Sequence, residues 1–322
     1  MTSNPSESAT DLDKRASSVR RHASAADRLF IGVDGGGTGC RARIAGRNGN
    51  TLGQGRAAPA ALRFGIDQSL AAVESACRAA ATDAGLPATA LRQMDAVVGL
   101  AGVGRRGLLE ALIARPHPFN SVRYVNDATI ACLGAHRGHD GGVVIIGTGS
   151  VALAIAGGRE IRIGGYGFPI SDEGSGAAIG LGVLRTALKA YDGRISRTGL
   201  ADEVLARFRN DAFEMVAWMD DATATDYATF APLCLDLAER DDATAQHIVR
   251  EAAQEIDGLA TQLLRWTPRI ALLGGLANRM KSLLAPGVRA RLVPAMGDAI
   301  DGALLLARGL LGEGATAADG QR

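Results

Sequence analysis

The sequence contains few of the features that mark metal-binding or disulfide-rich proteins. Its 322 residues include only 4 cysteines, and no two of these form a CxxC pair. Such pairs supply the thiolates of structural zinc sites, and dense cysteine spacing marks small disulfide scaffolds. The scattered cysteines therefore argue against both classes and predict reduced thiols, as in a cytoplasmic protein. They are Cys40, Cys77, Cys132 and Cys234.

An excess of charge of one sign is also missing. The 35 basic and 34 acidic side chains leave a net charge of +1. Without an excess of positive charge, the chain has no broad field to attract nucleic acid or an anionic membrane. We therefore expect no nucleic acid and no membrane among its partners, and a small molecule instead.

Long apolar runs are absent as well. No run reaches the roughly 18 residues of a membrane-spanning helix, and the first residues lack the apolar core of a signal peptide. We expect a protein that stays in the cytoplasm. Residues 1–27 are rich in serine, alanine and charged residues, and this composition predicts a disordered tail.

The rest of the chain has ample material for a core, since 47% of the residues are hydrophobic. From Phe30 onward, strand and helix patterns alternate, and the length favours two domains. The patterns predict strands at 29–33, 40–44, 96–100 and 122–125, a hairpin turn at 46–50, and helices at 67–84, at 108–114 and from about Asp127.

The second half of the chain opens as the first does. Residues 141–163 contain an apolar strand, a Gly-Thr-Gly break, a second strand, a glycine turn and a third strand. This internal duplication predicts an α/β fold with two lobes facing each other across a cleft. We expect an N-terminal lobe at 28–138 and a C-terminal lobe at 139–322. The second lobe holds a helical insertion with helices at 212–219, 227–240 and 243–266, a strand at 270–275 and a last helix at 299–311 near the lobe junction.

Consecutive glycines separate the first two predicted strands. Glycine weakens a strand and has no side chain to pack against its neighbours. These glycines predict that a ligand approaches the backbone there, because bare N–H groups form a nest for a phosphate. A second break faces the first from the other lobe, and a third glycine pair follows a later strand, where a base or ribose fits. Each break alone also suits an ordinary turn. The residues are Gly35, Gly36, Gly37 and Thr38; Gly147, Thr148, Gly149 and Ser150; and Gly274 and Gly275.

One carboxylate stands directly before the first break. Asp34 lies between the apolar strand and its glycines. Magnesium prefers oxygen ligands and keeps several of its waters. We therefore expect Asp34 to hold a Mg²⁺ ion through water.

Five motifs together carry a family resemblance that covers nearly everything from Phe30 to Leu311. "GVDGGGTGCRARI", "VIIGTGSVALAI" and "LLGGLAN" resemble two phosphate motifs and an adenosine motif, and "VNDATIACLGA" is similar to a catalytic segment. "GGYGFPISDEGSGAAIG" is the most specific match. The chain resembles the N-acetylglucosamine and glucosamine kinases of the BadF/BadG/BcrA/BcrD ATPase family. The resemblance implies a duplicated ribonuclease H-like, actin-like ATPase fold, with ATP and Mg²⁺ as cofactors and an amino sugar as substrate.

The resemblance also assigns roles to individual residues. Asp127 matches the catalytic base that takes a proton from the sugar hydroxyl, which the family places at the 6-position. Asp172 matches a sugar-binding aspartate. Each has an alternative role as a helix cap, Asp127 in competition with Asn126. The other implied contacts are Gly165, Tyr166 and Gly167 to the sugar and Thr38 and Thr148 to ATP.

Two departures from the family pattern bear on the acceptor. Ala60 and Ala61 stand where animal N-acetylglucosamine kinases carry a sugar-binding asparagine, and Tyr166 replaces a common tryptophan. They favour a bacterial-type glucosamine or N-acetylglucosamine kinase and leave open whether the acetyl group is required. A homodimer is expected from the resemblance alone. The alternative function is an ATP-driven activator of a partner enzyme, which would need paired cysteines for a bridging iron-sulfur cluster, whereas Cys132 stands alone.

Overall fold

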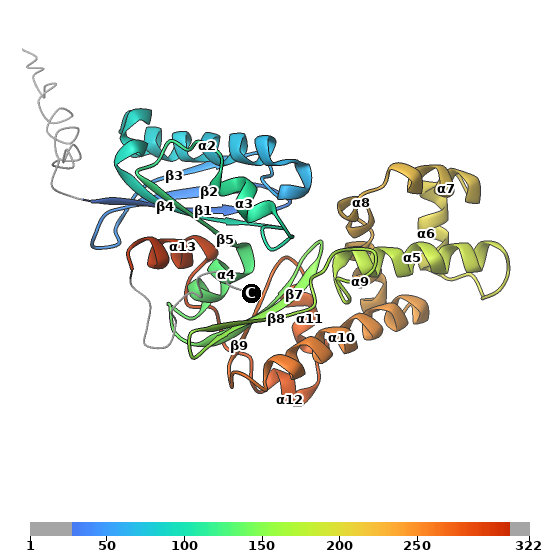
Figure 1. The fold of residues 1–322 in the computed structure, drawn as a ribbon. Helices are drawn as coiled ribbons and strands as arrows, with labels where there is room; N and C mark the ends of the chain where they lie inside the picture. Colours follow the sequence, from blue (N-terminus) through green and yellow to red (C-terminus); the bar gives the residue numbers. More distant parts are fainter. Residues whose placement is uncertain (1–27, 310–322) are drawn as a thin grey trace, which may run out of the picture.

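Two α/β lobes make up the computed structural model, which describes residues 28–309 (Figure 1). The tail predicted at 1–27 and the end of the helix predicted at 299–311 lie outside the described residues. One lobe contains a five-stranded sheet in the order β3-β2-β1-β4-β5, and the other a four-stranded sheet in the order β8-β7-β6-β9. Among residues 28–309, no helix combines the length and apolar character needed to cross a membrane.

The first sheet begins with an antiparallel meander and continues with two parallel strands. Crossover helices join the parallel strands, which places their carboxyl ends along one edge. In the register, Asp34 lies beside Gly99, and Leu100 lies beside Asn126. The elements are β1 (Leu29–Gly35), β2 (Cys40–Ala45), β3 (Thr51–Ala57), η1 (Leu62–Phe64), α2 (Ile66–Asp83), η2 (Ala88–Gln93), β4 (Met94–Leu100), α3 (Leu108–Ile113) and β5 (Ser121–Asn126).

The second sheet repeats this plan, as the sequence predicted. A meander of β6, β7 and β8 is followed by β9, which runs parallel to β6 and pairs Leu273 with Ile145. The four strands are β6 (Gly141–Ile146), β7 (Ser150–Ala156), β8 (Arg159–Ile163) and β9 (Ile270–Leu273). The shared order of antiparallel and parallel strands confirms the duplicated α/β fold.

The chain between β8 and β9 forms the helical part of the second lobe (Figure 1). Its core includes an aromatic cluster in which Trp218 packs against Phe208, Tyr227 and Phe230. The helix α6 has no counterpart in the sequence-based prediction. The helices are α5 (Gly176–Tyr191), α6 (Gly199–Arg207), α7 (Ala212–Asp221), α8 (Ala224–Ala228), α9 (Ala231–Glu239) and α10 (Ala243–Leu263).

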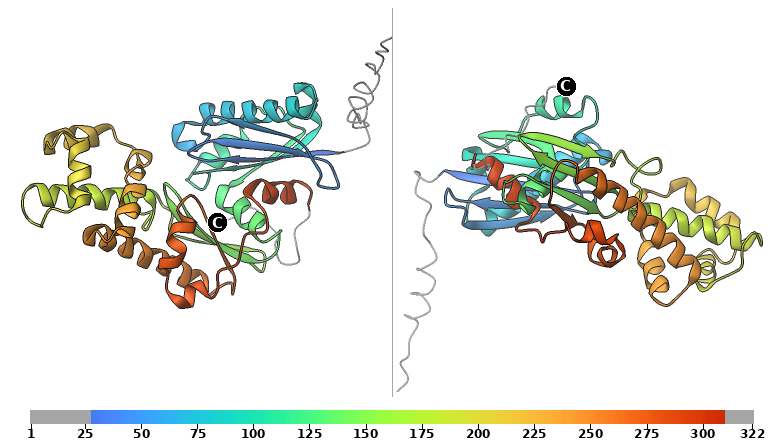
Figure 2. Two further views of the ribbon diagram at one scale, coloured as in Figure 1. Left: turned by 180° about the vertical axis from the view of Figure 1, so that it is seen from behind. Right: turned by 90° about the horizontal axis from the view of Figure 1, so that it is seen from below.

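Two helices lie between the sheets and join the lobes (Figure 2). α4 (Asp127–Ala135) contacts strands of both sheets, and α13 (Ala299–Ala307) packs against α4, β1 and β4. The helices cross at Gly134 and Gly302, where a Cβ would lie within 1.8 Å of the Asp298 carbonyl oxygen and 1.9 Å of the Ile130 carbonyl oxygen. The short elements that lead to α13 are α11 (Ala277–Met280), η3 (Lys281–Leu283) and α12 (Pro286–Arg289).

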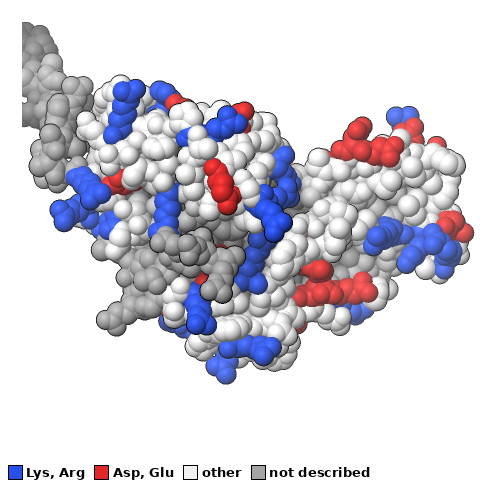
Figure 3. Space-filling view, viewed as in Figure 1, with Lys and Arg blue, Asp and Glu red and all other residues white. Residues whose placement is uncertain are grey.

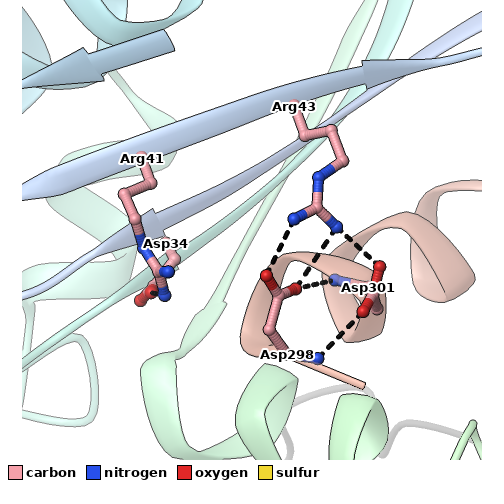
Figure 4. A network of polar contacts seen from close by, with 5 residues as sticks. All are labelled: Asp34, Arg41, Arg43, Asp298 and Asp301. Carbon is pink, nitrogen blue, oxygen red and sulfur yellow. Dashed lines mark hydrogen bonds and ion pairs between the residues drawn. The ribbon is translucent and has the colours of Figure 1, made fainter. Parts of the chain in front are cut away.

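An ion-pair network anchors α13 to the first sheet (Figure 4). The Arg43 guanidinium on β2 lies 2.8 Å from Asp298 Oδ2 and 2.6 Å from Asp301 Oδ1. The two aspartates also form a capping box, because each accepts a backbone N–H of the other. The helix α13 therefore packs with the N-terminal sheet, although in the sequence it follows the strands of the second sheet.

Candidate functional site

The first glycine turn lies between β1 and β2. It is closed by the Gly36 N–H, which donates to the Gly39 carbonyl at 3.0 Å. Gly35 is packed, since a Cβ there would lie 2.6 Å from Leu100, whereas Gly36 and Gly37 are half-buried and Thr38 is exposed. The tip of the turn therefore leaves backbone groups and a hydroxyl accessible.

The second glycine turn is tied to the start of α5. The Gly176 N–H donates to the Gly147 carbonyl at 2.8 Å, and the Ala177 N–H donates to the Thr148 carbonyl at 3.1 Å. Ser150 is buried, and its hydroxyl donates to the Glu173 carbonyl at 2.6 Å. Thr148 thus offers a half-buried hydroxyl at the turn, while the Ser150 hydroxyl holds the neighbouring loop.

The third glycine pair meets the second turn. Gly274 has a φ of 97°, and a Cβ there would lie 2.2 Å from the Ile146 carbonyl oxygen at the end of β6. Nothing lies within 4 Å of a Cβ built on Gly275. Since Ile146 directly precedes Gly147, the structure brings the predicted adenosine motif beside the predicted phosphate turn.

Asp127 is the first residue of α4 and lies at the carboxyl edge of the first sheet. Asn126 is the N-cap, and its Oδ1 accepts the Ala128 N–H at 3.0 Å. The pKa of Asp127 is raised to about 6, chiefly by burial and also by the charge of Asp34, while the hydrogen bond from the Ala128 N–H and the charge of Arg162 lower it. The capping role therefore falls to Asn126, although Asp127 Oδ1 also accepts the Ala128 N–H at 3.0 Å.

Asp34 lies near the end of β1, where its Oδ2 accepts a hydrogen bond from Arg41 at 2.6 Å (Figure 4). Among residues 28–309, no three His, Cys, Asp or Glu side chains gather as ligands for a metal ion. A magnesium ion here would take most of its ligands from water and phosphate oxygens, which is the coordination that Mg²⁺ favours. A single carboxylate at the strand edge fits that kind of site.

Asp172 lies between the loop after β8 and the second glycine turn. Its Oδ1 accepts the Gly167 N–H at 3.1 Å, and its Oδ2 lies 2.5 Å from where a Cβ of Gly149 would stand. Burial raises its pKa. The N-cap of α5 is Ser175, whose side chain accepts the Ala178 N–H. Asp172 therefore does not take its alternative capping role, and its carboxylate faces the turn.

The predicted sugar loop is shaped by an arginine that the sequence did not single out. Arg162 on β8 donates to the carbonyls of Gly164 and Gly165, and its guanidinium lies 5.4 Å from the centre of the Tyr166 ring. Tyr166 itself is 77% exposed. The charge of Arg162 lowers the pKa of both Asp127 and Asp172, so it acts on carboxylates of both lobes.

The four cysteines bear on the alternative of an iron-sulfur activator. All four are buried. Cys132 lies inside α4, where its Sγ contacts the Gly141 carbonyl oxygen at 3.3 Å and burial raises its pKa to about 12. A cluster shared between subunits needs accessible thiolates, which this environment disfavours.

Known proteins are similar in sequence to most of this chain. The profile of the BadF/BadG/BcrA/BcrD ATPase family matches residues 31–307. The chain is 37% identical over 279 residues to glucosamine kinase GspK of Vibrio cholerae, covering 86% of this chain and 95% of that protein. It is 28% identical over 261 residues to N-acetyl-D-glucosamine kinase of Dictyostelium discoideum, covering 74% of this chain and 79% of that protein.

Solved structures show the same architecture. A crystal structure from Chromobacterium violaceum, provisionally described as an N-acetylglucosamine kinase, has a TM-score of 0.82 and 37% identity, covering 87% of this chain and 99% of that one. A ROK family glucokinase from Streptomyces griseus, solved with glucose and AMPPNP, has a TM-score of 0.53 and 19% identity, covering 87% and 99%. The second similarity concerns the fold alone, and both confirm the two-lobed fold.

Proposed function

The chain belongs to the BadF/BadG/BcrA/BcrD ATPase family, and from that premise we propose that it phosphorylates the 6-hydroxyl of glucosamine or N-acetylglucosamine with ATP. It is an ATP-dependent amino-sugar kinase, in agreement with its relatives from Vibrio and Dictyostelium. The observation that carries the proposed chemistry is the half-buried carboxylate of Asp127, whose pKa is about 6. Such a group is ionised at neutral pH and still basic enough to accept a proton.

The proposed reaction is an in-line displacement at the terminal phosphorus. The sugar hydroxyl oxygen forms a bond to this phosphorus, the bond to the bridging oxygen breaks, and ADP leaves with that electron pair. The hydroxyl proton passes to the carboxylate of Asp127. Asp34 and Arg162 set the basicity of this carboxylate in opposite directions.

The glycine turns support the proposal for the nucleotide. In the proposed complex with ATP, backbone N–H groups of the two turns bind the phosphates, and Gly274 and Gly275 lie against the adenosine. Thr38 and Thr148 add hydroxyl donors, while Ser150 contributes by holding the second turn to the loop that carries Glu173. The turn residues concerned are Gly35, Gly36, Gly37, Gly147 and Gly149.

Asp34 is the residue proposed to hold Mg²⁺, through water. When bound, this ion would neutralise charge on the phosphate oxygens. Arg41 fixes one oxygen of the Asp34 carboxylate and so orients the group.

The sugar contacts proposed from the motif are Asp127, Asp172 and the loop of Gly165, Tyr166 and Gly167. Asp172 and the loop are hydrogen-bonded to each other, so they would bind the sugar as one unit. Ala60 is fully buried and lies 3.2 Å from a Cβ built on Gly35. Because a buried alanine stands where animal enzymes carry the asparagine, recognition of an acetyl group would come from other residues.

We also propose the lobe limits 28–138 and 139–322, with α13 returning to the first sheet through Arg43. Four buried free cysteines suit the reducing cytoplasm, where ATP is available. A homodimer is carried over from the family resemblance, and light scattering of the purified protein would test it.

The first experiment is coupled ADP release from ATP and Mg²⁺, with glucosamine, N-acetylglucosamine and glucose offered separately. Release that depends on one amino sugar identifies the acceptor, and phosphorus-coupled NMR of the product identifies the hydroxyl. ADP release that no sugar stimulates would contradict the proposal and favour the activator. A brown protein after anaerobic purification would point the same way.

A further inference from the structure

Arg63 extends from the N-terminal lobe toward the first glycine turn. It belongs to η1, in the loop between β3 and α2. One of its guanidinium nitrogens lies 3.2 Å from where a Cβ of Gly37 would stand. The exposed side chain therefore lies against the tip of the turn that is proposed to bind phosphate.

The same guanidinium reaches the other lobe. Its NH2 group donates to the hydroxyl of Thr225 on α8 at 3.0 Å. Figure 1 shows the loop that precedes α2 facing α8 across the gap between the lobes. Arg63 thus spans the two sides of the site.

The far end of this contact lies beside the second glycine turn. A Cβ built on Gly176 would lie 3.1 Å from the Gly147 carbonyl oxygen and 3.2 Å from the Ala228 Cβ. Ala228 is the last residue of α8, the helix that carries Thr225. The guanidinium is therefore located between the first turn and a helix that packs against the second.

The two turns contain no lysine or arginine, so their backbone N–H groups supply no net charge to offset that of a polyphosphate. Two neighbouring arginines have other partners. Arg41 is bound to Asp34, and Arg162 is bound to the carbonyls of the sugar loop. The acceptor of Arg63 is a neutral hydroxyl, so this contact leaves its charge uncancelled.

The opposite face of the gap adds one carboxylate. Asp226 follows Thr225, and its hydrogen bonds from Thr223 lower its pKa, with a smaller contribution from the charge of Arg63. Figure 3 shows basic side chains along the edge of the first lobe that faces this helical part. Asp226 is already hydrogen-bonded to Thr223, so this single carboxylate does not neutralise the basic edge of the first lobe.

We propose that Arg63 is a phosphate-binding residue that contacts the polyphosphate tail of the nucleotide from the first glycine turn. The proposal rests on the proposed function, because it assumes a nucleotide in this cleft. A guanidinium presents two parallel N–H groups to phosphate oxygens, whereas an ammonium presents a point charge. Thr225 holds this planar group in place from the other lobe.

The test compares the affinities of wild type and Arg63→Ala for ATP, ADP and AMP by calorimetry without sugar. The variant should lose roughly 10- to 100-fold in ATP affinity, as expected for a lost charge-assisted contact, with AMP affinity unchanged. Arg63→Lys should recover part of the loss. Arg78→Ala, which removes an exposed arginine of α2 that pairs with Glu74, is the matched control and should bind as wild type does.

Three outcomes would overturn the inference. Wild-type ATP affinity in Arg63→Ala would reject the phosphate contact and leave the kinase assignment intact. An equal loss for AMP and ATP would show that the contact between lobes matters instead of the phosphate charge. Wild-type protein that binds no ATP would overturn the proposed function together with this inference. A melting curve for each variant confirms that it is folded.

Discussion

At the scale of single residues, Asp127 combines two properties that oppose each other. Its half-buried carboxylate lowers the stability of the folded state, because burial disfavours the charged form. The same burial gives it a pKa of about 6, near the value that suits a general base at neutral pH. A side chain selected only for stability would not be charged here.

Asp127→Asn tests both properties. We expect kcat to fall by about 10²- to 10⁴-fold, the range for loss of a general base, with ATP affinity unchanged. Asn can still accept the Ala128 N–H, so the helix start is preserved. Full activity of this variant would remove Asp127 from the mechanism.

The same variant should be more stable than wild type at neutral pH. A carboxyl group whose pKa is raised in the folded state destabilises that state above its unfolded pKa, and the effect is complete above the folded pKa of about 6. We expect a gain of about 1–2 kcal/mol at neutral pH, reduced by the lost attraction to the helix N-terminus, and no gain below about pH 4. Urea unfolding at the two pH values measures it, and a gain that is independent of pH would contradict the cause.

The charge of Arg162 should affect the pH dependence of kcat/KM. Its charge lowers the pKa of Asp127, against burial and the charge of Asp34. In Arg162→Ala the pKa of Asp127 should rise, so the acid limb of kcat/KM should move to higher pH. Arg162→Lys keeps the charge and should keep the limb, while weaker binding of the loop carbonyls raises KM for the sugar. Arg159→Ala, on the same strand, is the control.

At the scale of elements, the crossing of α4 and α13 joins the two lobes. Both helices lie between the sheets, and their backbones approach because Gly134 and Gly302 have no side chains. The apolar cluster around this crossing includes Val97 of the first sheet and Val143 of the second. A change in the distance between α4 and α13 would therefore shift residues of both sheets.

Gly302→Ala should destabilise the protein by about 2–4 kcal/mol, because its Cβ would meet a backbone carbonyl that cannot move aside. Gly258→Ala is the matched control, since it lies in α10 with nothing within 4 Å of a Cβ. That change should stabilise by about 0.5–1 kcal/mol through helix propensity. Urea unfolding compares the two, and similar effects would show that the crossing is not tightly packed.

At the scale of the whole molecule, three aspartates with lowered pKa hold different regions together. Burial raises the pKa of each, but hydrogen bonds outweigh it: Asp95 accepts from Ser121, Asn120 and Arg28, Asp242 from the start of α10, and Asp298 from Asp301 and Arg43. They lie in the first sheet, the helical part and the lobe junction. A lowered carboxyl pKa stabilises the fold above the unfolded value and is lost as pH falls through the folded value.

Stability should therefore decrease as the solution is acidified below about pH 4. Asp298→Asn should be less stable than wild type at neutral pH, and the difference should shrink in acid, where the wild-type carboxyl is also uncharged. Melting temperatures across this range measure it. Asp67→Asn, whose side chain in wild type is 80% exposed, should match wild type throughout, and a constant deficit for Asp298→Asn would reject the electrostatic cause.

The local sequence determined most elements and the family. Apolar periodicity marked the meanders and α2, and glycines marked both turns, because these signals are carried by residues close together in the chain. The helix expected at 227–240 is instead split between α8 and α9, where Pro232 stands at the start of the second helix. Pro at this position starts a helix more readily than it continues one.

Tertiary structure alone decided the electrostatics of the site. The pKa of Asp127 depends on its burial in the folded protein and on the charges of Asp34 on β1 and Arg162 on β8. None of these can be read from the residues next to Asp127 in the sequence. The contact of Arg63 with Thr225 joins residues 162 positions apart. The return of α13 to the first sheet through Arg43 spans 255 positions to Asp298. Such contacts form only when the chain packs, because charge and burial act through space and not along the sequence.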